Sequence, residues 1–190
     1  MASSVDVLVV AATERELADG LPCPTLLCGV GPVDAAARVA AMLADLRPAA
    51  ILHVGIAGAR RASALEPAQL VIGSVARYTD LEVPAKFAPQ EVAPDARLLD
   101  AARRALPEAR VLPIATVARV GASVGCDVEA MEGFAVLRAA QLAGVPALEL
   151  RAISNEIEET DRSRWHFDRA FAALTAATPR LVEAISACVR

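Results

Sequence analysis

The chain has 190 residues, a length that suits one α/β domain able to bury its own core. Its net charge is −4 and its 19 basic residues form no block, which argues against a nucleic-acid-binding protein. Polar residues interrupt every apolar run, the longest candidate, residues 5–12, is too short to cross a bilayer, and the N-terminus lacks the basic start of a signal peptide. We therefore expect a cytoplasmic protein with one domain, 1–190, and neither a membrane nor a nucleic acid as partner.

Cysteine and histidine give no sign of a metal site. Four cysteines occur without any CxxC pair, and the two histidines, His53 and His166, lie far apart in the sequence. The spacing typical of zinc ligands is therefore absent, and free thiols in a reducing compartment are expected. We expect no metal and no other cofactor.

The first half of the chain alternates strand and helix patterns. Residues 5–12 and 25–28 are typical of buried strands, and a glycine turn at 29–31 precedes a helix that begins at Pro32. The apolar residues of that helix follow the i, i+3, i+4, i+7 spacing, and Arg47-Pro48 ends it. Further strands are predicted at 50–54, which runs into a turn at 55–59, and at 70–76.

The second half continues the alternation. A surface loop or short edge strand is predicted at 81–94, a helix near 95–106, a strand at 111–117, a tight connection at 118–126, a helix at 131–143 and a strand at 147–153. Gly144 is expected to end the helix before it, Thr160 or Asp161 to cap the last helix, and Pro179 to kink or restart that helix. Such alternation predicts a three-layer α/β sandwich with a mixed, twisted central sheet, and no internal repeat is evident.

Acidic residues follow the first strand at Glu14 and Glu16. Ligands gather at the carboxyl ends of strands in open α/β sheets, and a carboxylate there can accept a proton from water. The alternative interpretation is a pair of solvated acids in the first turn of a helix. The glycine segments 29–31 and 55–58 leave a similar choice between backbone contacts to a ligand and plain tight turns.

A second acidic segment, 127–133, lies at a strand-to-helix junction. A carboxylate here can accept both hydrogen bonds of a cis-diol such as ribose O2′ and O3′, while Met131 packs on the sugar. The alternative is a capping acid beside a core methionine. Trp165, next to His166 and Phe167, either forms the wall of a pocket or packs in the core.

In chain order these segments resemble the purine nucleoside phosphorylase and nucleosidase superfamily over nearly the whole chain. Its nucleosidase branch has an acidic stretch after the first strand that ends in the catalytic glutamate, and Glu16 falls on that position. Ala-Arg-Tyr-Thr-Asp at 76–80 resembles the family's ARY-x-D stretch. The resemblance implies a nucleoside phosphorylase-like fold and a pocket lined by five residues: Ile56, Ala57, Gly58, Trp165 and Phe167.

Two further motifs carry the resemblance. Val-Glu-Ala-Met-Glu-Gly at 128–133 resembles the ribose-binding VE-x-MEG/A motif, which implies that Met131 and Glu132 bind the sugar. Arg-Ala-Ile-Ser-Asn at 151–155 matches RAIS-D/N, whose last residue, here Asn155, faces the purine. The connection between residues 117 and 127, by contrast, is shorter than in the family, and that region usually supplies base contacts.

Within the superfamily the sequence looks most like the futalosine hydrolases, on Met-Glu-Gly at 131–133, Ile-Ser-Asn at 153–155 and the segment 161–165. Adenine-releasing relatives carry aspartate where this chain has Asn155. An asparagine cannot protonate N7, but its NH₂ can donate to O6 while its carbonyl accepts from N7–H. This pattern favours a 6-oxopurine such as hypoxanthine, because polar groups would be left unpaired against adenine.

The resemblance implies hydrolysis of futalosine to hypoxanthine and dehypoxanthine futalosine in menaquinone biosynthesis, through an oxocarbenium-like transition state. Glu16 would act as general base on water, Glu132 would hold the ribose hydroxyls, and Asn155 would stabilise the leaving base. The alternatives are a 5′-methylthioadenosine/S-adenosylhomocysteine nucleosidase, a purine nucleoside phosphorylase, and a non-catalytic nucleoside-binding module. A homodimer is expected, because nucleosidases of the superfamily usually pair.

Overall fold

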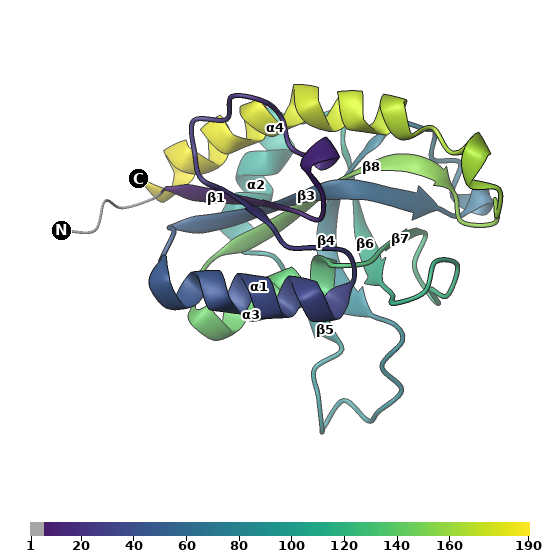
Figure 1. Ribbon diagram of the computed structural model, residues 1–190, viewed down its shortest axis with the longest axis horizontal. Coiled ribbons are helices and arrows are strands. Elements are labelled where there is room, and N and C mark those ends of the chain that lie inside the picture. Colours follow the sequence, from purple (N-terminus) through teal and green to yellow (C-terminus); the bar gives the residue numbers. More distant parts are fainter. Residues whose placement is uncertain (1–5) are drawn as a thin grey trace.

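The computed structural model describes residues 6–190 as one mixed sheet with helices on both of its faces (Figure 1). The strands are β1 (Val7–Ala11), β2 (Thr25–Leu27), β3 (Ala50–Ala59), β4 (Leu70–Tyr78), β5 (Glu91–Val92), β6 (Arg110–Thr116), β7 (Val128–Ala130) and β8 (Ala147–Glu156). The helices are α1 (Pro32–Asp45), α2 (Ala96–Ala105), α3 (Gly133–Ala143) and α4 (Phe167–Val189), with short 3₁₀ turns η1 (Glu14–Glu16), η2 (Arg61–Ser63) and η3 (Arg162–Arg164). The α/β class predicted from the sequence is confirmed, and Val5, which the pattern included in the first strand, lies outside the described residues.

The sheet is mixed and partly closed on itself. Its strand order is β2-β1-β3-β7-β6-β4-β5, and β8 pairs with both β3 and β4. The strands β3, β7, β6, β4 and β8 therefore form a closed ring, in which β3–β7 and β4–β8 are antiparallel and the other pairs are parallel. A core cluster comes from these five strands and from Leu65 before β4, and it includes Ala57, Val71, Ile114, Val128 and Ile153.

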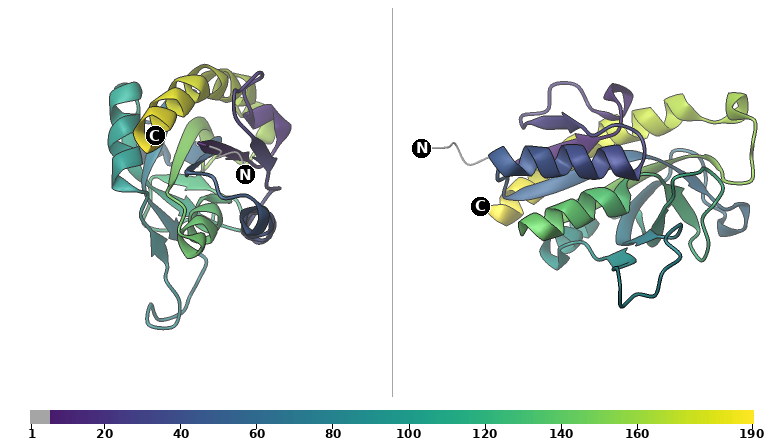
Figure 2. Two further views of the ribbon diagram at one scale, coloured as in Figure 1. Left: turned by 90° about the vertical axis from the view of Figure 1, so that its left-hand side faces the viewer. Right: turned by 60° about the horizontal axis from the view of Figure 1, so that its bottom comes forward.

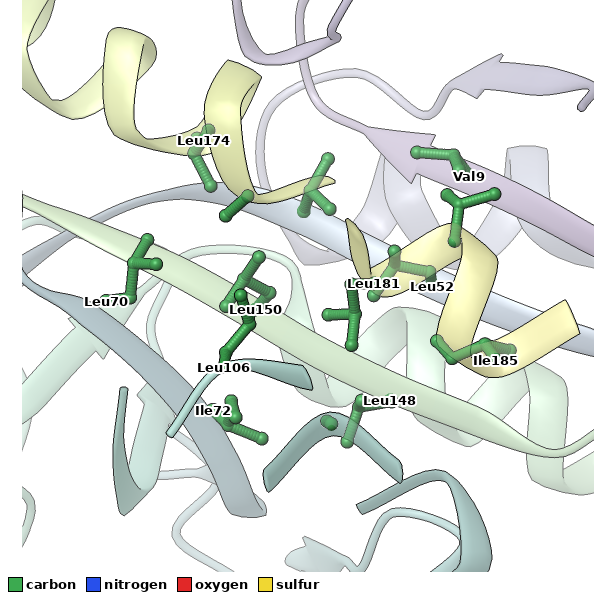
Figure 3. Packing of buried hydrophobic residues seen from close by; sticks show 14 of the residues in the cluster. Val9, Leu52, Leu70, Ile72, Leu106, Leu148, Leu150, Leu174, Leu181 and Ile185 are labelled. Carbon is green, nitrogen blue, oxygen red and sulfur yellow. The ribbon is translucent and has the colours of Figure 1, made fainter. Parts of the chain in front are cut away.

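Two helix pairs cover the sheet and give the three layers (Figure 2). The helices α1 and α3 bury their apolar faces on one side, and α2 and α4 bury theirs on the other. Figure 3 shows Leu174, Leu181 and Ile185 of α4 facing the sheet residues Leu52 and Leu150. All five side chains are fully buried, and each such burial stabilises the fold by roughly 1.5–3 kcal/mol.

Several predicted helix ends match the structure for the expected physical reasons. Pro32 occupies the first turn of α1, where a missing N–H costs nothing, and Gly144 ends α3 in the left-handed conformation with a φ of 70°. Asp95 caps α2 by accepting from the backbone N–H groups of Arg97 and Leu98. Asp161 caps the short turn η3 rather than the last helix, which begins at Phe167.

The predicted turn at residues 55–59 is wrong. These residues continue strand β3 as far as Ala59, and β8 likewise runs through Ser154 and Asn155 to Glu156. The glycines at 55 and 58 are needed for space inside a strand rather than for a turn: a Cβ on Gly55 would overlap the guanidinium of Arg151.

Helix α4 is continuous from Phe167 to Val189, so the restart that the sequence offered as one alternative at Pro179 does not occur. Pro179 and Thr175, whose carbonyl loses its partner to the proline, are both exposed, so water can satisfy that carbonyl. By length and composition α4 is the one described helix that could cross a membrane. Its apolar stripe, however, lies on the sheet, and we interpret it as a core helix.

Candidate active site

One cavity of about 320 Å³ opens where β1, β3, β7 and β8 end. All nine residues that the sequence singles out line it: Glu16, Ile56, Ala57, Gly58, Met131, Glu132, Asn155, Trp165 and Phe167. They come from segments up to 151 positions apart in the sequence (residues 16 to 167), and the fold brings them together. The remaining wall includes Thr13, Arg15, Val30, Val120, Glu129, Ser154 and Phe171.

Hydrogen bonds fix the carboxylate of Glu16 in the wall of the cavity. Oε2 accepts from the backbone N–H of Thr13 at 2.8 Å and from its hydroxyl at 3.0 Å, and Oε1 accepts from the N–H of Ile56 at 3.1 Å. The side chain is 5% exposed, whereas the neighbouring Glu14 is exposed. The interpretation of Glu16 as a solvated acid is therefore wrong, because the turn η1 points it inward.

Glu132 lies at the junction between β7 and α3, next to Met131. Its Oε1 accepts from the backbone N–H of Gly31 at 2.9 Å, and its Oε2 lies 3.5 Å from the Nη2 of Arg151. The glycine turn 29–31 thus delivers a backbone N–H to Glu132. Burial raises the pKa of Glu132, and the nearby Arg151 and the Gly31 N–H only partly oppose this.

A fully buried guanidinium, that of Arg151, links the acidic side chains. Its Nε donates to Glu149 Oε1 at 2.7 Å, and its Nη2 lies 2.5 Å from the Nε2 of His53. The Nδ1 of His53 lies 3.0 Å from the carbonyl of Val10, an acceptor, so this nitrogen carries the proton and Nε2 accepts from Arg151. Burial, followed by the charge of Arg151, lowers the pKa of His53 well below its ordinary value, which keeps the imidazole neutral.

We call Glu16 and Glu132, which line the cavity, together with the buried Glu149 and Arg151, which do not, the acidic end of the cavity. Burial alone disfavours a charged guanidinium, but Glu149, Glu132 and Glu16 together raise the pKa of Arg151. The acidic end thus contains three carboxyl groups and one guanidinium, and the neutral His53 adds no charge. This excess of acid suits a ligand on which positive charge develops.

Glycines make room for this cluster. A Cβ at Gly55 would meet Arg151 and the Oε1 of Glu16, and a Cβ at Gly133 would overlap the carboxyl of Glu149. Packing therefore explains the glycine of Met-Glu-Gly, because α3 begins directly against the buried Glu149 and leaves no room for a side chain at Gly133. Oε2 of Glu149 has no hydrogen-bond partner among the described residues.

Asn155 lies at the other end of the cavity, which we call the amide end. Its Nδ2 donates to the carbonyl of Glu156 at 2.9 Å, and its Oδ1 accepts from the Ser154 hydroxyl at 2.7 Å. A carbonyl can only accept, so the Glu156 contact fixes which atom of the amide is nitrogen. One N–H and one lone pair remain for a ligand.

Three aromatic rings form a wall of the cavity. The ring centroids of Trp165 and Phe167 are 5.4 Å apart, and those of Phe167 and Phe171 are 6.2 Å apart. Arg15 lies over the Phe171 ring at 4.5 Å and pairs with the exposed Asp168 at 2.9 Å. The sequence alternatives for Trp165 and Phe167 are thus decided in favour of a pocket wall, since both line the cavity.

Sequence reasoning missed the roles of His53, Glu149 and Arg151. A signal for two of them was present, because Glu149 and Arg151 are two residues apart in an apolar strand and must share a face. Glu129 was also missed as a cavity residue. It lies 5% exposed beside Gly58 and accepts from backbone N–H groups of the connection 118–126. Within residues 6–190, no group of three or more His, Cys, Asp or Glu side chains is arranged to hold a metal ion.

Solved structures of nucleosidases share this fold. A 5′-methylthioadenosine/S-adenosylhomocysteine nucleosidase from Colwellia psychrerythraea 34H, in complex with adenine, superposes with a TM-score of 0.80 at 19% identity, covering 98% of this chain and 96% of that one. An S-adenosylhomocysteine nucleosidase from Streptococcus pyogenes, in complex with 5-methylthiotubericidin, gives a TM-score of 0.80 at 21% identity, covering 97% and 98%. The expected nucleoside phosphorylase-like fold is confirmed.

A sequence relative is similar over a shorter stretch. The futalosine hydrolase of Streptomyces coelicolor is 53% identical over 57 residues, which are 30% of this chain and 24% of that protein. The match thus spans about a quarter of the relative's length. The profile of the Phosphorylase superfamily, in contrast, matches residues 15–122 and 115–190, which include both ends of the cavity. With the fold, the cavity and this match in agreement, the chain belongs to the Phosphorylase superfamily.

Proposed function

We propose that the protein is an N-glycosidase that hydrolyses futalosine to hypoxanthine and dehypoxanthine futalosine, a step of menaquinone biosynthesis. The observation that carries the proposal is the convergence of Glu16, Glu132 and Asn155 on one cavity, with the amide of Asn155 fixed in one orientation. The similarity to a stretch of a futalosine hydrolase supports the choice of substrate.

In the proposed reaction, Glu16 takes a proton from the water that attacks C1′ of the ribose while the C1′–N9 bond breaks; the bonding electrons leave with the hypoxanthine, which takes up a proton from water at N7. Thr13 and Ile56 hold the Glu16 carboxylate in place, so this catalytic group needs little reorganisation before it takes the proton. Glu132 accepts hydrogen bonds from the ribose hydroxyls, and the surplus of acidic groups around Arg151 favours the positive charge that builds on the sugar. Met131 packs on the sugar.

Asn155 would select the base. Its free N–H donates to O6 of hypoxanthine and its free lone pair accepts from N7–H, whereas the 6-amino group and unprotonated N7 of adenine reverse both roles. The aromatic wall of Trp165, Phe167 and Phe171 would pack on the substrate.

Phosphorolysis fits the cavity less well. Among the described residues that line the cavity, Arg15 alone is basic, and its guanidinium already pairs with Asp168. A phosphate would need more donors than this. The second candidate is a 5′-methylthioadenosine/S-adenosylhomocysteine nucleosidase, because solved structures of those enzymes share the fold over nearly the whole chain.

The test is incubation with futalosine, inosine and 5′-methylthioadenosine, each with and without phosphate, followed by chromatography of the released base. We expect hypoxanthine from futalosine without phosphate. A phosphate requirement would show a phosphorylase, and preferred release of adenine would show the second candidate. Binding of hypoxanthine without turnover of any nucleoside would favour a non-catalytic module.

We also propose that the protein works as a homodimer in the cytoplasm. Val30 lines the cavity yet is 61% exposed, and the neighbouring Val33 at the start of α1 is 78% exposed. A second copy placed here would cover both side chains. Sedimentation at micromolar concentration is expected to give a dimer, and a monomer would reject this proposal.

A further inference from the structure

Glu149 is a fully buried carboxyl group that does not line the cavity. It belongs to β8, which runs beside β3, and the register of the two strands pairs His53 with Glu149 and Gly55 with Arg151 (Figure 1). Glu149 and Arg151 are two residues apart, so they project from the same face of their strand. A Cβ on Gly55 would meet both the Arg151 guanidinium and Oε1 of Glu16, so the guanidinium reaches the edge of the cavity.

Arg151 makes its shortest carboxylate contact with Glu149. Its Nε donates to Oε1 of Glu149 at 2.7 Å, whereas its Nη2 lies 3.5 Å from Oε2 of Glu132. Burial lowers the pKa of Arg151, and of the three carboxylates that raise it, Glu149 has the largest effect. The charge of the guanidinium is thus balanced first by a carboxylate that lies outside the cavity.

His53 occupies a second part of the guanidinium. One N–H of Arg151 Nη2 donates to Nε2 of His53 at 2.5 Å, which leaves one N–H of this nitrogen to face Glu132 at 3.5 Å. Charge-assisted hydrogen bonds between nitrogen and a carboxylate are usually about 2.7–2.9 Å long. The contact of Arg151 with Glu132 is therefore loose, and the neutral imidazole fixes the guanidinium without adding charge.

We propose that Glu149 is a positioning residue of the hydrolysis: by binding Arg151 on its Nε side, outside the cavity, it balances this guanidinium and leaves the negative charges of Glu16 and Glu132 to the sugar. This inference rests on the proposed function and concerns a residue that touches no substrate. Without the charge of Glu149, the Arg151 guanidinium would pair with Glu132, and the cavity would lose most of its preference for a positively charged sugar ring.

Two sugar analogues that differ only in one ring atom test this preference. 1,4-Dideoxy-1,4-imino-D-ribitol carries a positive charge on its ring nitrogen near neutral pH, and 1,4-anhydro-D-ribitol has a neutral ring oxygen. NMR titration gives the Kd of each for wild type and for Glu149→Gln, whose amide oxygen can still accept from Arg151 Nε. We expect wild type to bind the cationic ring at least about tenfold tighter and Glu149→Gln to lose most of that preference. An unchanged preference in Glu149→Gln, or none in wild type, would overturn the proposal.

The matched control is Glu108→Gln. This substitution makes the same change of charge, but it breaks an exposed pair with Arg180 that lies outside the cavity. Both Kd values should stay at the wild-type level. If Glu108→Gln lost the preference as Glu149→Gln does, net charge alone would explain the effect, and the role of Glu149 would be rejected.

A double variant separates balance of charge from simple support of the fold. In Glu149→Gln/Arg151→Met both partners are neutral, so the charges of Glu16 and Glu132 are unopposed and the preference for the cationic ring should return to at least the wild-type level. A double variant without that preference would contradict the proposal. Replacing a buried ion pair as a whole costs less stability than removing one partner, so this variant also decides the question if Glu149→Gln does not fold.

Turnover gives a second readout. The sugar ring becomes positive only in the transition state, so Glu149→Gln should lower kcat on futalosine by about tenfold or more while KM changes by less than about threefold. A raised KM with unchanged kcat would show that Glu149 supports ground-state binding and would overturn the proposal. The two sugar analogues carry no base, so a failure to hydrolyse futalosine would refute the proposed function and leave the binding result to stand by itself.

Discussion

At the acidic end of the cavity, Glu16 and Glu132 are held by a fully buried guanidinium and by backbone N–H groups of distant segments. At the amide end, Asn155 and Glu129 have no ion pair among the described residues and depend on hydrogen bonds to their own strand and to the connection 118–126. A single substitution among buried charges that neutralise one another is poorly tolerated, whereas side chains beside a short connection can be substituted one at a time. The difference suggests that the reaction is fixed at one end and the choice of base at the other.

The largest effect is expected from removing the proposed general base. Glu16→Gln keeps the shape of the side chain but cannot take a proton from water, so turnover should fall by on the order of 10² to 10⁴. Hypoxanthine binding should largely survive, because the amide end is untouched. Steady-state kinetics and calorimetry measure the two quantities, and a fully active variant would show that another group activates the water.

The next largest effect concerns stability at the acidic end. Arg151→Met leaves the buried Glu132 and Glu149 without their cation, which should lower the free energy of unfolding by about 3–5 kcal/mol. The control is Arg180→Met, which breaks an exposed pair with Glu108 and should cost at most about 1 kcal/mol. Urea unfolding compares the two, and equal losses would contradict a special role for the buried cluster.

A smaller change is expected at the amide end. Asn155→Asp replaces the donor to O6 with an acceptor and supplies a possible acid for N7, so activity on futalosine should fall relative to an adenine nucleoside. Loss of the donor should cost roughly 1–3 kcal/mol, because a buried O6 is left unsatisfied. The measurement is kcat/KM on both substrates; if their ratio does not move, Asn155 does not read the base.

The smallest effect is a displacement of the acid limb of the pH profile. Because burial raises the pKa of Glu132, this carboxylate becomes neutral, and activity should fall, at a pH above the 4.5 of an unperturbed glutamate. The raised folded pKa also means that Glu132 stabilises the fold below its unfolded pKa and that this contribution is lost as the pH rises through the folded pKa. The pH dependence of kcat/KM and of unfolding checks both signs, and an acid limb that Glu132→Gln leaves in place would assign it elsewhere.

Much of this arrangement could be predicted from sequence because its signals are local. Alternating apolar runs indicate the strands and helices, and the short motifs around Glu16, Glu132 and Asn155 place those residues at the ends of strands. Gly55 was misinterpreted as part of a turn because the requirement for glycine there is not local. The side chain that occupies the space beside it, Arg151, is 96 positions away in the sequence. A glycine in a strand looks like a turn until the opposing side chain is known.

The acidic cluster and Glu129 illustrate the same limit. His53 resembles any polar residue within an apolar run, and only the pairing of β3 with β8 shows that it faces Arg151. Glu129 belongs to a recognised motif, but its orientation follows from the connection that folds over it and from the register of β7 against Gly58. Long-range register, which the sequence pattern does not specify, decides what these side chains touch.

The closed ring of five strands also bears on aggregation. Each of the strands β3, β4, β6, β7 and β8 pairs with a strand on both sides over part of its length, so none of them is an edge strand of the sheet. The strand order ends instead at β2 and β5, which have three and two residues. Templates this short give an incoming strand few hydrogen bonds, so the apolar strand sequences of this chain are shielded from edge-to-edge polymerisation.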